Sequence, residues 1–88
     1  MSWDYKFSEQ AIKKFRKLNP SVQKIILAYL DKYVKGSSDP RLFGKKLVAN
    51  FAGTWRYRVG DYRIICKIRD HELLVLVISV GHRKNVYD

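Results

Sequence analysis

Residues 54–67 read TWRYRVGDYRIICK, and this stretch decides the fold that we expect for the chain. Apolar and basic side chains alternate over residues 55–59, which is the period of a half-buried strand. Gly60 and Asp61 then suit a two-residue hairpin loop, because a type II′ turn requires Gly at its first central position. If these two residues are the whole loop, the register is fixed and Arg58 lies directly opposite Arg63.

This register gives the hairpin one apolar face and one basic face. The apolar face carries Trp55, Tyr57, Tyr62, Ile64, Cys66 and Ile68, and the basic face carries Arg56, Arg58, Arg63 and Lys67. Like charges directly opposite each other destabilise a sheet, so the pairing of Arg58 with Arg63 suggests that a polyanion, most simply a nucleic-acid backbone, supplies the counter-charge. The alternative is a solvated face whose arginines pair with acidic residues elsewhere. The planar guanidinium fork suits phosphate and favours the polyanion.

The composition agrees with a polyanionic partner. The 88 residues include 18 Lys and Arg against 8 Asp and Glu, a net charge of +10. A domain this basic is expected to meet nucleic acid, an acidic protein or an anionic membrane surface. The length predicts one domain, residues 1–88, with one modest core that includes the single Cys66. No apolar run is long enough to span a membrane and no signal peptide is recognisable, so we expect a cytoplasmic protein.

The first half of the chain predicts a strand and two helices. Aromatic residues alternate with polar ones over residues 3–7, as in a short strand. Ser8 is a suitable N-cap for a first helix, and Asn19-Pro20 ends that helix and opens a second one. The second helix has the strongest periodic signal in the sequence, a stripe of Val22, Ile25, Ile26, Tyr29, Leu30 and Tyr33.

The second half predicts a meander of strands. Residues 36–40 form a loop, and residues 41–52 fit either a short strand or a turn of helix. After the hairpin, residues 73–80 are almost continuously apolar, which is typical of a central strand covered on both sides. The expected fold class is α+β: an N-terminal strand, an antiparallel helix hairpin and a three-stranded antiparallel meander that together form one mainly antiparallel sheet.

The sequence lacks the residues that several kinds of catalytic site require. The chain has no Gly-rich phosphate loop before a helix, no His/Cys pair at zinc spacing and no Ser/His/Asp set. The hairpin cations remain, together with the residues that follow the last strand, His82, Arg83, Lys84 and Tyr87. These types suffice for a metal-free ribonuclease, which needs a base for the ribose 2′-OH, cations on the phosphate, an acid for the leaving oxygen and an aromatic ring for a splayed base. A non-catalytic RNA-binding surface fits them equally well.

Residues 54–68 and 77–87, TWRYRVGDYRIICKI and VISVGHRKNVY, resemble the RelE/ParE superfamily of bacterial toxin–antitoxin toxins, and the RelE branch in particular. The resemblance implies the RelE-like fold and an mRNA endonuclease that acts in the ribosomal A site, beside 16S rRNA. Such a toxin cleaves through attack of the 2′-OH, needs no metal or other cofactor, and is neutralised by a cognate RelB-like antitoxin. The catalytic set that we derive with this resemblance is Arg58, Arg63, His82, Arg83 and Tyr87. The RNA-binding set is Arg56, Lys67, Lys84, Lys45 and Lys46.

One departure from the RelE pattern concerns proton transfer. RelE itself carries lysines at the positions that match Arg56 and Arg58. A lysine can donate a proton and an arginine effectively cannot, so we hypothesise that His82 is the general acid or base. Two alternatives to the nuclease are a ParE-like inhibitor of DNA gyrase, which shares the fold, and a non-catalytic RNA-binding module.

Overall fold

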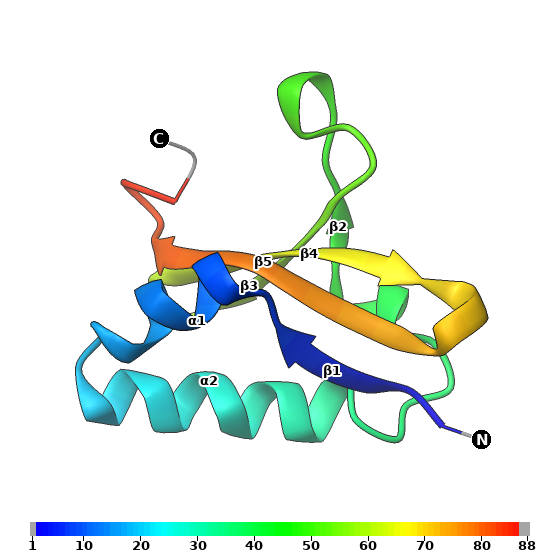
Figure 1. Ribbon diagram of the computed structural model, residues 1–88, viewed down its shortest axis with the longest axis horizontal. Helices are drawn as coiled ribbons and strands as arrows, with labels where there is room; N and C mark the ends of the chain where they lie inside the picture. The colour runs from blue at the N-terminus through cyan, green and yellow to red at the C-terminus, as the bar shows by residue number, and fades with distance from the viewer. Residues whose placement is uncertain (1, 87–88) are drawn as a thin grey trace.

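The molecule consists of one five-stranded sheet with both of its α-helices on the same side, as Figure 1 shows. The computed structural model describes residues 2–86. The elements are β1 (Asp4–Phe7), α1 (Glu9–Arg16), α2 (Pro20–Tyr33), η1 (Pro40–Phe43), β2 (Lys45–Lys46), η2 (Ala49–Phe51), β3 (Trp55–Val59), β4 (Tyr62–Arg69), η3 (Asp70–Glu72) and β5 (Leu74–His82). In Figure 1, α2 runs below the sheet, while residues 47–53 and the end of the described chain rise above it.

The strand order is β1-β5-β4-β3-β2. β1 is parallel to β5, and the other neighbouring strands are antiparallel. This arrangement confirms the predicted α+β class and the mainly antiparallel sheet. Within residues 41–52, for which the sequence left two possibilities, both a two-residue strand (β2) and a short 3₁₀ turn (η2) are present.

The hairpin has the predicted register. Its five Cα pairs run from Val59 opposite Tyr62 to Trp55 opposite Cys66, and Arg58 lies opposite Arg63. Gly60 has a φ of +58°, as the first central residue of a type II′ turn requires. The two-residue loop therefore fixes which side chains share each face of the sheet.

Local side-chain bonds define where the helices begin. The Ser8 side chain accepts a hydrogen bond from the Ala11 N–H, and the Asn19 side chain accepts one from the Ser21 N–H. These N-caps satisfy backbone donors that have no partner within the helix. The stripe of α2 is narrower than predicted: Ile26 is fully buried, but Ile25 is 58% exposed. Ile25 stands about 100° around the helix from Ile26, beyond the edge of the sheet-facing seam.

The core lies between the sheet and α2. It includes Tyr57 of β3, Cys66 of β4 and Val75 of β5, all fully buried. β5 is a central strand, as predicted, but only its helix-facing side is fully covered, because Leu74 and Leu76 are half-buried on the other side. Among the described residues, no helix is long and apolar enough to cross a membrane.

Candidate nucleic-acid interface

A basic surface lies on the side of the sheet that faces away from α2. Alternation along β3 and β4 directs Arg56, Arg58, Arg63 and Lys67 to this side, because the residues between them pack in the core. We call these four residues the arginine face. In Figure 1 this side of the sheet lies between residues 47–53 and the end of the described chain, which both rise from it. Ile65 lies among them and is only 1% exposed, so this side of the sheet also has a covered apolar position.

Arg63 is held in place by the hairpin turn. Its Nη1 donates to the carbonyl oxygens of Gly60 at 2.8 Å and of Tyr62 at 2.9 Å, and the residue is only 7% exposed. These carbonyl oxygens offset part of the repulsion between Arg63 and the exposed Arg58 opposite it. The guanidinium of Arg63 is therefore fixed before any ligand arrives.

The other cations of this face are without acidic partners. Three ion pairs are present within residues 2–86, and none includes Arg56, Arg58 or Lys67. The buried Nε of Arg56 has no hydrogen-bond partner in the same part of the chain, and Lys45 of β2 lies opposite Arg56 as a second like-charge pair. Within residues 2–86, the alternative of arginines paired with carboxylates elsewhere therefore does not apply to these side chains. They are available to an anion from outside the molecule.

Arg41, unlike Arg56 and Arg58, has an acidic partner within the protein. Arg41 donates from Nη1 and Nη2 to the two carboxylate oxygens of Asp70, at 2.9 and 2.7 Å, and lies 5.6 Å from the ring centre of Trp55. This hydrogen bonding lowers the pKa of the Asp70 carboxyl. Arg41 therefore has a structural role in tying η1 to η3.

The end of β5 brings Arg83 to the turn that anchors Arg63. The Arg83 N–H donates to the Asp61 carbonyl at 2.7 Å, and its Nε lies 3.9 Å from an Asp61 carboxylate oxygen. Both side chains of this ion pair are more than half exposed, so it is weak and an anion can displace it. Sequence reasoning treated Asp61 only as a turn residue and missed this role, because nothing in the sequence shows that the turn and residue 83 are neighbours. Lys84 is exposed beside Arg83.

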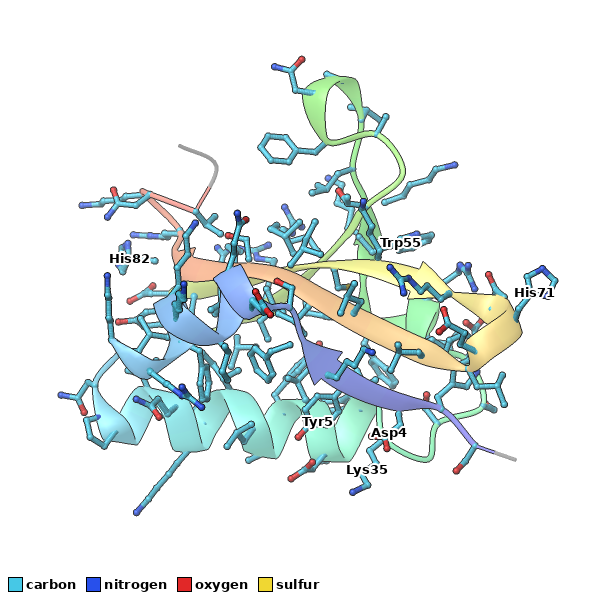
Figure 2. The ribbon with its side chains drawn as sticks, in the orientation of Figure 1. Asp4, Tyr5, Lys35, Trp55, His71 and His82 are labelled. Atoms are coloured by element: carbon cyan, nitrogen blue, oxygen red, sulfur yellow. The ribbon has the colours of Figure 1, made fainter. Side chains whose placement is uncertain are left out.

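His82 lies on the other side of the sheet. It is directly opposite Tyr62, whose ring packs against the core on the helix side, and the two ring centres are 5.6 Å apart. Its Nδ1 accepts a hydrogen bond from the Lys84 N–H at 3.2 Å. Figure 2 shows His82 at the end of the sheet near α1, and His71 at the opposite end. The structure therefore does not bring His82 together with Arg58 and Arg63. Tyr87, also predicted for the site, lies outside the described residues.

Comparison with known proteins identifies the family. A sequence profile described as ParE toxin of type II toxin-antitoxin system, parDE, matches residues 5–87. The chain belongs to the RelE/ParE toxin superfamily. Toxin RelG of Mycobacterium tuberculosis is 33% identical over 89 residues, which cover 99% of this chain and 98% of that protein. This confirms the resemblance seen in residues 54–68 and 77–87.

Solved structures agree with this assignment. The RelBE2 toxin-antitoxin complex of M. tuberculosis has a chain that matches 94% of this toxin, over its own full length, with 26% identity and a TM-score of 0.79. The isolated RelE toxin of E. coli matches 92% of this chain and 84% of its own, with 25% identity and a TM-score of 0.73. The toxin of the archaeal RelE-RelB complex from Pyrococcus horikoshii shares the fold at 20% identity, with a TM-score of 0.73.

The arrangement in this RelE/ParE toxin can bind phosphate but holds few groups that exchange protons. Within residues 2–86, no cluster of three His, Cys, Asp or Glu side chains is placed to hold a metal ion. Burial raises the pKa of the Cys66 thiol to about 12, so Cys66 is a core residue, as predicted, and not a nucleophile. What the toxin offers an anionic ligand on this side is positive charge on two anchored β-strands.

Proposed function

We propose that this toxin is a ribosome-dependent mRNA endonuclease that works without a metal ion and inhibits translation. The observation that carries the proposal is the grouping of arginines around one turn. Arg63 donates to the carbonyls of Gly60 and Tyr62, and the Arg83 N–H donates to the Asp61 carbonyl. Arg58 lies opposite Arg63 and has no acidic partner in the described part of the chain. Guanidinium groups fixed beside a phosphate can stabilise the charge that develops as it reacts.

In the proposed reaction the ribose 2′-oxygen forms a bond to phosphorus, and the bond from phosphorus to the 5′-oxygen breaks. The products are a 2′,3′-cyclic phosphate and a free 5′-hydroxyl. Arg58, Arg63 and Arg83 stabilise the extra negative charge on the phosphate oxygens, while Arg56 and Lys67 bind neighbouring phosphates. Exposed Lys45, opposite Arg56, and Lys84 extend this positive surface. Lys46, predicted for the same RNA-binding set, lies opposite Trp55 and therefore on the other face of the sheet.

Two protons must also move, one from the 2′-OH and one to the 5′-oxygen. The arginines do not exchange them at neutral pH. The position of the His82 ring behind the sheet gives no support to its hypothesised role as general acid or base. By resemblance to RelE, Tyr87 is the remaining candidate on this chain for stacking on a base and assisting proton transfer.

We also propose that a cognate RelB-like antitoxin covers the arginine face. The RelE-type toxins of M. tuberculosis and P. horikoshii named above were solved as complexes with their antitoxins. A covering segment should carry carboxylates for Arg56 and Arg58, because unpaired cations select an oppositely charged partner.

The test is to incubate the purified toxin with ribosomes programmed with a defined mRNA and to map the new RNA ends. We expect cuts within the A-site codon, only when ribosomes are present, and their loss in Arg58→Gln. Lys24→Gln is the charge-matched control, because Lys24 lies on exposed α2 surface. Intact mRNA together with blocked supercoiling by gyrase would replace the proposal with ParE-like action. Intact mRNA with retained RNA binding would favour a non-catalytic module.

A further inference from the structure

A second basic site lies on the helix side of the sheet. At the end of α1, next to the last residues of β5, the surface has an open pocket of about 330 Å³ lined by Lys14, Lys17, Leu18, Tyr62, His82 and Val86, among others. We call it the α1–β5 pocket. Tyr62 and His82 share the helix-facing side, and the pocket lies at the edge of β5 beyond its last pair with β1, where Lys14 reaches Ser79. Its lining includes none of the arginine-face residues.

Two aromatic rings form one wall of this pocket. The rings of Tyr62 and His82 meet edge to face, with an interplanar angle of 80°. The bond from the Lys84 N–H to Nδ1 orients the imidazole and leaves its Nε2 without a partner among residues 2–86. Apolar Leu18 and Val86 complete the lining. Such a surface accommodates a flat ring that carries polar atoms at its edge.

The rim of the pocket carries positive charge that no ion pair within residues 2–86 neutralises. Lys14 donates from Nζ to the Ser79 hydroxyl at 3.3 Å, and Lys17 is exposed. None of the three ion pairs within the described residues involves α1, although Lys13 and Arg16 add two more cations to this helix. The pocket therefore combines an aromatic wall with lysines that have no acidic partner within residues 2–86, and such lysines attract an anionic ligand.

We propose that the α1–β5 pocket binds one nucleotide of single-stranded RNA, with its base against Tyr62 and His82 and its phosphate at Lys14 and Lys17. The volume lies at the lower end of the range of about 300–1,000 Å³ for small-molecule sites, which suits one nucleotide. Aromatic rings next to cations are how proteins hold an unstacked base and its backbone. An acidic peptide would use the lysines but would leave the ring wall unfilled. The site is independent of the cleavage proposed for the arginine face.

The test is an NMR titration of the full-length toxin, free of antitoxin, with adenosine 5′-monophosphate, adenosine and inorganic phosphate in parallel. We expect saturable shifts at Tyr62 and His82 with the nucleotide, and affinity at least about tenfold weaker for either part alone, because ring and phosphate each contribute. A trinucleotide should shift the same residues. Equal affinity for phosphate and nucleotide would overturn the proposal and leave a simple anion site.

Charge-matched variants locate the binding. Lys14→Gln with Lys17→Gln should weaken nucleotide affinity by about tenfold or more, whereas Lys13→Gln with Lys24→Gln, which removes as much charge outside the pocket lining, should not. Equal losses in both pairs would reduce the effect to net charge and overturn the proposal. In Arg58→Gln, the nucleotide should still change the NMR chemical shifts of His82, even if this variant no longer cleaves mRNA. Nucleotide shifts confined to Arg58 and Arg63 would likewise overturn it.

Discussion

Replacing the two arginines that face each other across the hairpin should change stability in opposite directions. In Arg58→Gln, the repulsion between the exposed Arg58 and Arg63 is removed. Relief of a like-charge cross-strand pair is worth about 0.2–1 kcal/mol. In an 88-residue domain, each kcal/mol of added stability raises the melting temperature by roughly 4–8 °C. We therefore expect Arg58→Gln to be as stable as the parent toxin or slightly more stable.

Arg63→Gln should have the reverse effect on stability. Arg63 is 7% exposed, and its Nη1 makes two hydrogen bonds to turn carbonyls, so solvent does not replace them readily. A hydrogen bond from a charged donor contributes about 1.5–3 kcal/mol. Because both bonds share one nitrogen, we expect a total loss of about 2–3 kcal/mol, or roughly 8–24 °C in melting temperature.

Both variants should nevertheless lose cleavage on programmed ribosomes, by about 10²–10³-fold at 25 °C, the effect typical of removing one donor to a reacting oxyanion. Urea unfolding gives the free energies, and single-turnover cleavage gives the rates. Arg58→Gln that loses more than about 1 kcal/mol would refute the account of Arg58 as an unsatisfied cation. Arg63→Gln with unchanged stability would refute the anchoring role of the turn.

Three further predictions concern the partner, the core and His82. The rate of association with the cognate antitoxin should fall steeply between 50 mM and 500 mM salt, roughly following the screening of charge, in stopped-flow measurements. Because burial raises the pKa of the Cys66 thiol from 9.0 to about 12, the thiol ionises at lower pH in the unfolded chain than in the folded one. The stabilisation from the neutral buried thiol is therefore complete below about pH 9 and is lost as the pH rises toward 12. Between pH 8 and pH 11, the free energy of unfolding should fall less in Cys66→Ala than in the parent toxin. His82→Gln should retain the shape of the pH–rate profile, and a vanished limb between about pH 5 and 8 would restore it as the general acid or base.

The hairpin and both helix starts could be predicted because short-range rules determine them. A two-residue loop fixes every pair from Val59 and Tyr62 outward, and Ser8 and Asn19 act as caps within three residues of their own positions. Residues 41–52 show neither the helical nor the strand period of apolar residues, so their structure depends on tertiary contacts. β2 forms because β3 offers a free edge. A Cβ at Gly44 would lie 3.1 Å from the Tyr57 ring, so that segment packs too closely against the core for other residues.

The candidate site was predictable for β3 and β4 but not for the end of β5, and the cause is one irregularity in register. A bulge between Ile65 and Cys66 inserts one extra residue, Ile78, into β5. Had the pairing that places Cys66 opposite Val77 continued without the bulge, Asp61 would lie opposite His82, and alternation would place His82 on the arginine face. A one-residue shift reverses the faces of every residue that follows.

With the bulge, Arg63 lies opposite Gly81, and the ladder continues to the bond between Arg83 and Asp61. Gly81 carries no side chain, and Val86 occupies the space that a Cβ there would face, at 3.6–3.9 Å. Arg83 rather than His82 reaches the turn. The apolar run of residues 73–80 hides this bulge, because a run that is apolar at every position gives no alternation from which a slip could be recognised. The same inserted residue therefore brings Arg83 to the turn beside the arginine face and sets the His82 ring beside Tyr62 on the helix-facing side.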